Sequence, residues 1–381
     1  MNLRLTKTIE ERRNVLEKEL ETALPAIGNN ILEDSSASEK NCENMIGAIQ
    51  IPLGIAGPLK VNAKNYFIPL ATTEGALVAS VNRGCKAITE SGGAHVSVKR
   101  IGVTRGPVFS IKTENEKILL EQYFVDHMEE IRNIAEQTSG HLKLLRIETQ
   151  YEHPYEFVRF YFDTGEAMGM NMVTIGSHAI AGHIQKTLGI RCIAISGNFC
   201  VDKKPSLQNF RNGRGRWVTG EVTLPGEVLE RVLKTTAKDF FEVWHAKCLV
   251  GSKITGIIGG NAQIANIIAA LFVATGQDIA HITEGSMGVT TTEYTPGSDE
   301  VHVSVVLPDI MVGTVGGGTG LPTQKESLGI LGISGGGNGE RADELAGIVA
   351  GASLAGEISL IASLAQGSLG KAHESLARGK K

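Results

Sequence analysis

Two adjacent lysines follow an apolar run in the stretch SGNFCVDKKPS, residues 196–206. Taken alone, Asp202-Lys203-Lys204 is more often a solvated turn than a functional site. The stretch comes directly after a predicted buried strand, at a junction between predicted domains, and Pro205 stiffens its exit. A lysine ammonium held in a pocket at such a junction can stabilise an oxyanion that develops during a reaction. The stretch therefore indicates oxyanion chemistry, with the solvated turn as the alternative.

Two carboxylates stand next to predicted helix ends. Glu74 in ATTEGALVAS is placed where a carboxylate stabilises a helix N-terminus, and the functional alternative is a buried acid beside a lysine. Asp278 in ATGQDIAHI follows Gly276, which is predicted to end a helix. The negative end of a helix dipole disfavours a carboxylate, so we expect a raised pKa for Asp278, as proton chemistry requires. A solvated turn is the alternative for Asp278.

Histidines and amides supply further candidates. His373 lies in a polar tail, where a histidine is either simply solvated or delivered as a general acid by a mobile segment. Asn261 and Asn266 in GGNAQIANI could face a ligand or pack between helices. His178 and His183 are five residues apart, which is not the i, i+4 spacing of a helical metal pair, so we expect no metal.

The elements that must position these residues alternate in type through the middle of the chain. A strand is expected at 108–113, a long helix at 115–137, two alternating strands at 142–151 and 155–163, a helix at 167–188 and a strand at 191–196. The order β-α-β-β-α-β is the ferredoxin-like pattern. Since neither flank completes a layered core, we expect an inserted domain at 107–194.

The flanks are predicted to form one larger, helix-rich domain, residues 1–106 and 195–381. Its N-terminal segment contains an amphipathic helix within 7–24, and Gly- and Pro-rich turns are expected around IPLGIAGPL. Further helices are expected at 74–90, 226–248, 261–275 and 341–366, with strands at VTGEVTLP and SVVLPDI. The fold class is α+β.

Composition excludes several classes of protein. A net charge of −4 and a pI near 6.2 argue against a chain that mainly neutralises nucleic-acid phosphates. The longest apolar run, 264–274, is too short for a membrane span, and the N-terminus lacks a signal-peptide core, so we expect a cytoplasmic protein. The five cysteines are never spaced C-x-x-C, and G-x-G-x-x-G and the Walker sequence are absent.

Eight ordered stretches together resemble the 3-hydroxy-3-methylglutaryl-coenzyme A (HMG-CoA) reductase family. They are ENMIGAIQIPLGIAGPL, ATTEGALVASVNRGCKAI, TRGPV, GEAMGMNM, SGNFCVDKKPS, GGNAQIANI with GQD, GTVGGGTGLP and GKAHESLAR. The resemblance covers nearly the whole chain, and DKKP is typical of the branch shared by eukaryotic and many archaeal enzymes. We expect the membrane anchor to be absent. The resemblance implies reductive deacylation of HMG-CoA to mevalonate and coenzyme A with two NAD(P)H.

The resemblance assigns catalytic roles to four residues. Lys203 would stabilise the oxyanion, Glu74 would donate a proton with a raised pKa, and Asp278 would tune both. His373 would protonate the departing thiolate.

The resemblance also implies three binding sets. The hydroxymethylglutaryl group would contact Arg105, Ser196, Asp202, Lys204, Lys247 and Asn266. Coenzyme A would contact Ser80, Asn82, Arg83 and Lys86, where Lys86 replaces a common arginine. The dinucleotide would contact Ser139, Glu166, Met168, Gly169, Met170, Asn171, Met172, Val315 and Gly316.

Two departures from the family pattern bear on cofactor choice and regulation. Members that use NADPH commonly have Ser-Arg-Phe where this chain has Ser139-Gly140-His141, so the arginine that grips the 2′-phosphate is missing. Lys143 or Arg146 could replace it; we favour NADPH, with NADH as the alternative. Gly379 replaces the phosphorylated serine of animal enzymes, so that control is expected to be absent.

The resemblance further implies a homodimer with shared active sites and ENMIG at the contact, while a tetramer stays open. A mevalonate-oxidising enzyme is the alternative within the same chemistry, although the DKKP branch disfavours it. A non-catalytic protein that binds RNA or a regulatory ligand on a ferredoxin-like sheet is the alternative from another class. The acidic balance and the four intact catalytic residues disfavour that reading, so no nucleic-acid or membrane partner is expected.

Overall fold

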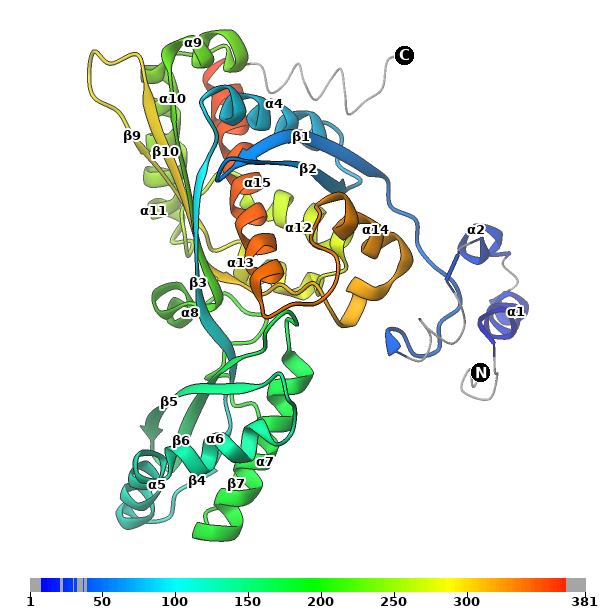
Figure 1. The fold of residues 1–381 in the computed structure, drawn as a ribbon, viewed down its shortest axis with the longest axis vertical. Helices are drawn as coiled ribbons and strands as arrows, with labels where there is room; N and C mark the ends of the chain where they lie inside the picture. Colours follow the sequence, from blue (N-terminus) through cyan, green and yellow to red (C-terminus); the bar gives the residue numbers. More distant parts are fainter. Residues whose placement is uncertain (1–7, 21–22, 30, 33–36, 38–39, 368–381) are drawn as a thin grey trace.

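One long strand, β3 (His95–Arg105), connects the two parts of the molecule that Figure 1 separates vertically. The computed structural model describes residues 8–20, 23–29, 31–32, 37 and 40–367. In the upper part β3 pairs antiparallel with β8 (Arg214–Leu224), and its last three residues pair with β6 (Tyr155–Asp163) of the lower part. No element was expected at 95–105. Arg105, at the end of β3, is therefore placed at the junction between the two parts.

The upper part is built around helix α15 (Glu340–Ala365), which contacts β8, β10 (Val301–Ile310) and α4 (Leu77–Glu90). By length and composition, helix α15 is long and apolar enough to cross a membrane. However, 94% of its apolar 18-residue stretch is buried inside the protein, as in a core helix. A Cβ at Gly84 would lie 1.9 Å from the Ala355 carbonyl oxygen, so only glycine permits this approach of α4 to α15. Strand β10 also pairs with β9 (Val289–Glu293).

The lower part has its own buried cluster of aromatic and aliphatic side chains. Its elements are β4 (Val108–Ser110), α5 (Glu114–Asp126), α6 (Met128–Glu136), β5 (Lys143–Glu152), β6, α7 (Met170–Leu188) and β7 (Cys192–Ala194). The strand order is β7-β4-β6-β5 with every neighbouring pair antiparallel. The single helix expected at 115–137 is two helices, because His127 has a ψ of 24° and its ring stacks on Tyr123.

The prediction of turns around IPLGIAGPL is wrong. Strand β1 (Leu53–Val61) occupies this segment and pairs antiparallel with β2 (Lys64–Ala71). The register shifts between Ala56 and Leu59, so that Pro58, which has no N–H to donate, lies in a bulge. The two-stranded β1–β2 ribbon packs against α4 and α12 (Ile264–Thr275).

The other expected helices appear with small changes of boundary. The N-terminal helix is α1 (Ile9–Leu20), and the helix expected at 226–248 is interrupted at Lys234, whose φ is +59°. The remaining elements are α2 (Pro25–Gly28), α8 (Leu207–Asn212), α9 (Gly226–Val228), η2 (Leu229–Leu233), α10 (Ala237–Trp244), η3 (His245–Gly251), α11 (Ser252–Thr255), η4 (Ile279–His281), α13 (Ile282–Gly285), η5 (Gly317–Gly320) and α14 (Pro322–Ile330).

Candidate functional site

The loop between β7 and α8 carries the two adjacent lysines in a strained backbone. Asn198, Val201 and Lys203 all have φ between 46° and 66°, a region that side chains other than glycine rarely adopt. Buried Asn209 holds the loop by donating to the Val201 carbonyl oxygen at 3.0 Å and to Asp309 Oδ2 at 2.7 Å. This strain and bracing indicate a functional loop rather than a solvated turn.

Lys203 points to Asp278, and its Nζ lies 2.7 Å from Oδ2 of that residue. As predicted, Gly276 ends α12 with a φ of 71° and turns the chain so that Asp278 faces the lysine. The expected rise in the pKa of Asp278 is wrong. Burial alone would raise that pKa, but the hydrogen bond from Lys203, the Ala280 N–H and the charges of His281 and Lys203 lower it below its ordinary value.

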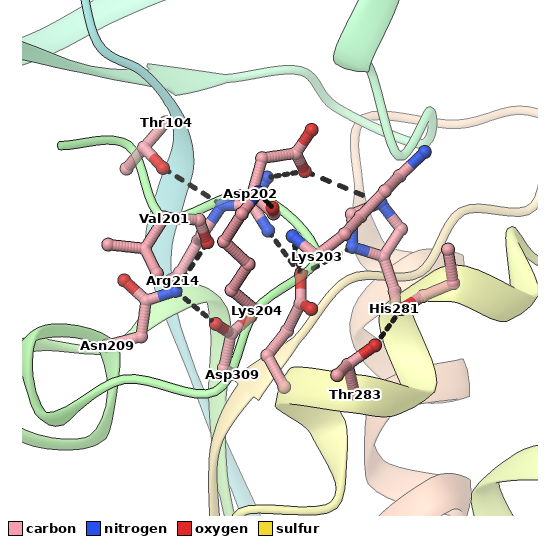
Figure 2. Close-up of polar contacts among 12 residues, drawn as sticks. Thr104, Val201, Asp202, Lys203, Lys204, Asn209, Arg214, His281, Thr283 and Asp309 are labelled. Atoms are coloured by element: carbon pink, nitrogen blue, oxygen red, sulfur yellow. Dashed lines mark hydrogen bonds and ion pairs between the residues drawn. The ribbon is translucent and has the colours of Figure 1, made fainter. Parts of the chain in front are cut away.

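Asp202 and Lys204 point elsewhere. The Asp202 carboxylate is paired with Arg214 Nη2 at 2.8 Å and with Arg105 Nη1 at 3.6 Å. Lys204 is exposed and donates from Nζ to the Asp202 carbonyl oxygen at 3.1 Å. Figure 2 shows Lys203 on the side of His281, with Arg214 next to Asp202. The adjacent lysines therefore have different surroundings.

Lys203 and Asp278 open into a cavity of about 760 Å³. The cavity is also lined by Ala167, the N-terminal end of α7 and the glycine-rich loop 315–318. Of the predicted dinucleotide contacts, it brings together Met168, Gly169, Met170, Asn171, Met172, Val315 and Gly316. A Cβ at Gly276 would lie 2.3 Å from the Gly318 carbonyl oxygen, so this glycine lets the loop approach Asp278.

Two predicted dinucleotide residues are placed differently. The buried Glu166 carboxylate accepts from the N–H groups of Gly339, Arg341 and Ala342, so it caps the N-terminus of α15. Ser139 follows α6 and accepts from the His141 N–H at 3.3 Å, and it is not among the residues that line the cavity.

Glu74 is exposed, so the expectation of a buried acid beside a lysine is wrong within one chain. It lines a second cavity, of about 410 Å³, with Ile55 and Asn82. No contact between Glu74 and Lys203 is present among the described residues of a single chain. Contact between Glu74 and Lys203 would therefore require a second chain or a different arrangement of this one.

The predicted coenzyme A residues connect α4 to its neighbours. Ser80 Oγ and Arg83 Nε both hydrogen-bond to Ser359 Oγ of α15, and Asn82 Oδ1 accepts from the Gly57 N–H. Lys86 forms a weak ion pair with Glu90 at 3.9 Å.

The remaining predicted residues are spread over other elements. Lys247, in η3, and Ser196 are exposed, Asn266 is half-buried in the first turn of α12, and Asn261 donates to the Ser286 and Gly288 carbonyl oxygens. His373 lies outside the described residues.

A buried ionic network beneath the lysines was missed by the sequence analysis. Arg214, fully buried, binds Asp202 through Nη2 and Glu284 Oε1 through Nη1 at 2.7 Å. His281 Nδ1 lies 2.6 Å from the same Glu284 oxygen. Burial and the nearby Glu284 charge raise the pKa of Asp309 to about 8. The i, i+3 spacing of Asp278, His281 and Glu284 is the sequence pattern from which part of this network could have been predicted.

Asp202, His281 and Glu284 have the spacing of a metal site. Arg214, however, already supplies a positive charge to two of the three. This arrangement favours an ionic network over a metal site, and the absence of a metal remains our prediction.

Solved structures share this fold. The class II HMG-CoA reductase from Streptococcus pneumoniae bound to NADPH in open conformations matches with a TM-score of 0.71 and 20% identity, over 93% of this chain and 96% of that chain. A likeness at this identity establishes the class of fold alone, a mixed α+β fold like that of HMG-CoA reductases.

Sequence comparison defines the family. The family described as hydroxymethylglutaryl-coenzyme A reductase matches residues 8–378. The reductase of Methanothermobacter thermautotrophicus is 46% identical over 98% of this chain and 94% of its own length, and that of Methanocaldococcus jannaschii is 47% identical over 97% and 92%. Reductase 1 of Dictyostelium discoideum is 41% identical over 98% of this chain and 69% of its own length. The chain belongs to the HMG-CoA reductase family, in its archaeal class I-like form.

Membership in this family defines the activity. The protein is an oxidoreductase of the mevalonate pathway that converts HMG-CoA to mevalonate with a nicotinamide cofactor. This activity excludes the alternative hypothesis of a non-catalytic binding protein.

Proposed function

We propose that the conversion proceeds at the Lys203–Asp278 pair and uses two molecules of NADPH. The observation that supports this proposal is the 2.7 Å ion pair inside a cavity lined by the start of α7 and the loop 315–318. Hydride addition to a thioester or aldehyde carbon places negative charge on oxygen, and the Lys203 ammonium would stabilise that charge. Asp278 would hold the ammonium in place.

The residues present fit a dinucleotide. Helix α7 begins at the cavity without a side-chain cap, so the N–H groups of its first turn are available to a phosphate. A Cβ at Gly316 or Gly317 would meet nothing within 4 Å, which leaves room beside the backbone. When bound, the cofactor supplies the hydride. Glu166, which caps α15, would fix the opposite wall rather than bind the ligand through its carboxylate.

The inserted domain is part of the proposal. The strand order β7-β4-β6-β5, antiparallel throughout, and the separate hydrophobic cluster support a ferredoxin-like dinucleotide domain at 107–194. Residues 1–106 and 195–381 would then form the large domain. We also propose a cytoplasmic location.

NADPH is favoured over NADH because a cation remains available. Arg146 is occupied by an ion pair with Glu148 and by stacking on the Tyr161 ring, with its Cζ 3.4 Å from the ring centroid. Lys143, exposed on β5, has no ion-pair partner among the described residues and could meet a 2′-phosphate.

Lys143→Ala should therefore lower kcat/KM for NADPH by about tenfold and leave that for NADH nearly unchanged. Absorbance at 340 nm with HMG-CoA measures both rates. Lys186→Ala, in the last turn of α7, is the matched control, because it removes an exposed lysine at the end of the helix away from the cavity. No oxidation of either cofactor by the wild type would overturn the function, and a clear NADH preference would overturn the choice of cofactor.

The substrate would extend from the catalytic pair in two directions. Arg105, Ser196, Asp202, Lys204, Lys247 and Asn266 would bind the hydroxymethylglutaryl group. Ser80, Asn82, Arg83 and Lys86 would contact coenzyme A. Since Arg83 and Ser80 already bond to Ser359, their contribution would include fixing α4 against α15.

A homodimer would complete the site. Glu74 and Lys203 open into different cavities of one chain, so a second copy would bring its Glu74 to this chain's Lys203 as the proton donor. Exposed apolar side chains at Ile49, Leu53 and Phe67, beside ENMIG and on the β1–β2 ribbon, support such a contact. His373 would protonate the leaving thiolate.

Mixing two inactive variants should restore activity. In a mixed dimer of Lys203→Ala and Glu74→Ala subunits, one site carries both substitutions and the other carries neither. Statistical reassociation of a two-fold dimer should therefore recover roughly a quarter of wild-type activity. The 340 nm assay after mixed refolding measures it. No recovery, with mixed dimers shown by sedimentation and mass spectrometry, would contradict the shared site, and each variant refolded alone is the control.

A further inference from the structure

His281 is a buried side chain that the assigned roles do not use. It is 1% exposed and lies at the end of η4, close to Asp278 and Asp202. Its Nδ1 lies 2.6 Å from Glu284 Oε1, and a carboxylate oxygen that also meets Arg214 and the Lys203 N–H can only accept. The proton of this contact is therefore on Nδ1 of His281.

The other ring nitrogen has no hydrogen-bond partner among the described residues. Nε2 of His281 is buried and faces two acceptors, Asp278 Oδ2 at 3.8 Å and Asp202 Oδ1 at 4.0 Å. A neutral ring with its proton on Nδ1 would turn a lone pair towards two carboxylates. A ring protonated on both nitrogens would instead direct an N–H toward both carboxylates.

We propose that His281 is a positioning residue that carries a proton on Nε2, keeps Asp278 ionised and oriented toward Lys203, and keeps the Asp202 carboxylate oriented toward Arg214 and Arg105. The proposal rests on the catalytic role proposed for Lys203 and Asp278. His281 touches neither lysine ammonium through any contact among the described residues, so it acts through the two carboxylates. It thereby links the oxyanion side of the site to the substrate-clamping side.

The charges around His281 come from several elements. Glu284 and Asp278 belong to its own segment, Asp202 and Lys203 to the loop after β7, Arg214 to β8, Asp309 to β10 and Arg105 to β3. Arg214 and Arg105 neutralise Asp202, whereas among the residues that the structure describes Asp278 has Lys203 and His281 as its cationic neighbours. Loss of the His281 charge should therefore affect Asp278 most.

His281→Asn tests this role. The asparagine amide reaches the position of Nδ1 and keeps a donor to Glu284, but it removes Nε2 and the charge. Because the His281 charge helps to hold the pKa of Asp278 below its ordinary value, we expect the acid limb of the kcat profile to move to higher pH. The KM for NADPH should be unchanged.

Two further variants make the outcome decisive. His281→Gln places a neutral donor near the position of Nε2, and its acid limb should move in the same direction; it serves if His281→Asn fails to fold. Thr283→Ala removes an exposed hydroxyl on the neighbouring turn and should leave the profile unchanged. Calorimetric unfolding midpoints confirm that each variant is folded.

The possible results separate the inference from the function it rests on. A wild-type pH profile in folded His281→Asn would show that the histidine only holds Glu284, and it would overturn the inference. If Lys203→Ala, measured in parallel, retains wild-type kcat, the proposed catalytic pair itself is wrong. A shifted acid limb with an inactive Lys203→Ala supports both.

Discussion

Lys203→Ala is expected to lower kcat for HMG-CoA reduction by about a hundred- to a thousandfold, with a much smaller change in KM. The ammonium stabilises charge that appears on oxygen only as hydride is added, so its removal affects the transition state more than the bound substrate. Asp278 would also lose its hydrogen-bond partner at 2.7 Å. Steady-state rates with varied HMG-CoA at saturating NADPH measure the effect.

Lys204→Ala is the matched control in the adjacent position. The Lys204 ammonium turns back to the Asp202 carbonyl oxygen and is exposed, so it is placed to meet a substrate carboxylate rather than the Asp278 side of the site. Its loss should therefore fall more on KM than on kcat. Equal changes of kcat in both variants would argue against separate roles for the two lysines.

The sequence predicted the elements well where periodicity was local. The alternation of β5 and β6, the glycine stop of α12 and the long helix α15 all follow from patterns within a single segment. Strands β1 and β3 were missed, because β1 contains Pro58 within a bulge and β3 changes partners along its length. Such features depend on distant strands, which a local pattern does not contain.

For the candidate site, the sequence predicted which residues are neighbours better than it predicted their electrostatics. Lys203 and Asp278 were selected correctly as neighbours, yet the pKa of Asp278 was expected to rise from its place after a helix. The cations that lower it come from the loop after β7 and from His281. Glu74 was expected beside the lysine, and its exposure in one chain could not be inferred without the packing of α4.

The network beneath the lysines was not predicted because its members are far apart in sequence. Arg214 stands in the basic segment RNGRGRW, which by itself indicates a solvated loop. In the structure its guanidinium is fully buried and connects Asp202 to Glu284, which lies 70 residues beyond Arg214 in the chain. Thr104 Oγ1 accepts from Arg214 Nε at 2.9 Å, so β3 completes its environment.

Arg214→Met is expected to destabilise the protein by about 3–5 kcal/mol, because it keeps most of the side-chain volume but leaves the buried Glu284 and the half-buried Asp202 carboxylates without their shared cation. Differential scanning calorimetry should show a clear fall in the unfolding midpoint. Arg231→Met, which removes an exposed arginine paired with Glu90, should change it little.

The dependence on pH distinguishes lost charge from lost packing. Protonation of a carboxylate removes the charge that has lost its partner, so the stability gap between Arg214→Met and the wild type should narrow as the pH is lowered from 8 to about 5.5. A gap that stays constant over this range would attribute the effect to packing alone. Since Asp202 is one of the two carboxylates, Arg214→Met should also raise KM for HMG-CoA. An unchanged KM would show that the buried network does not affect substrate binding through Asp202.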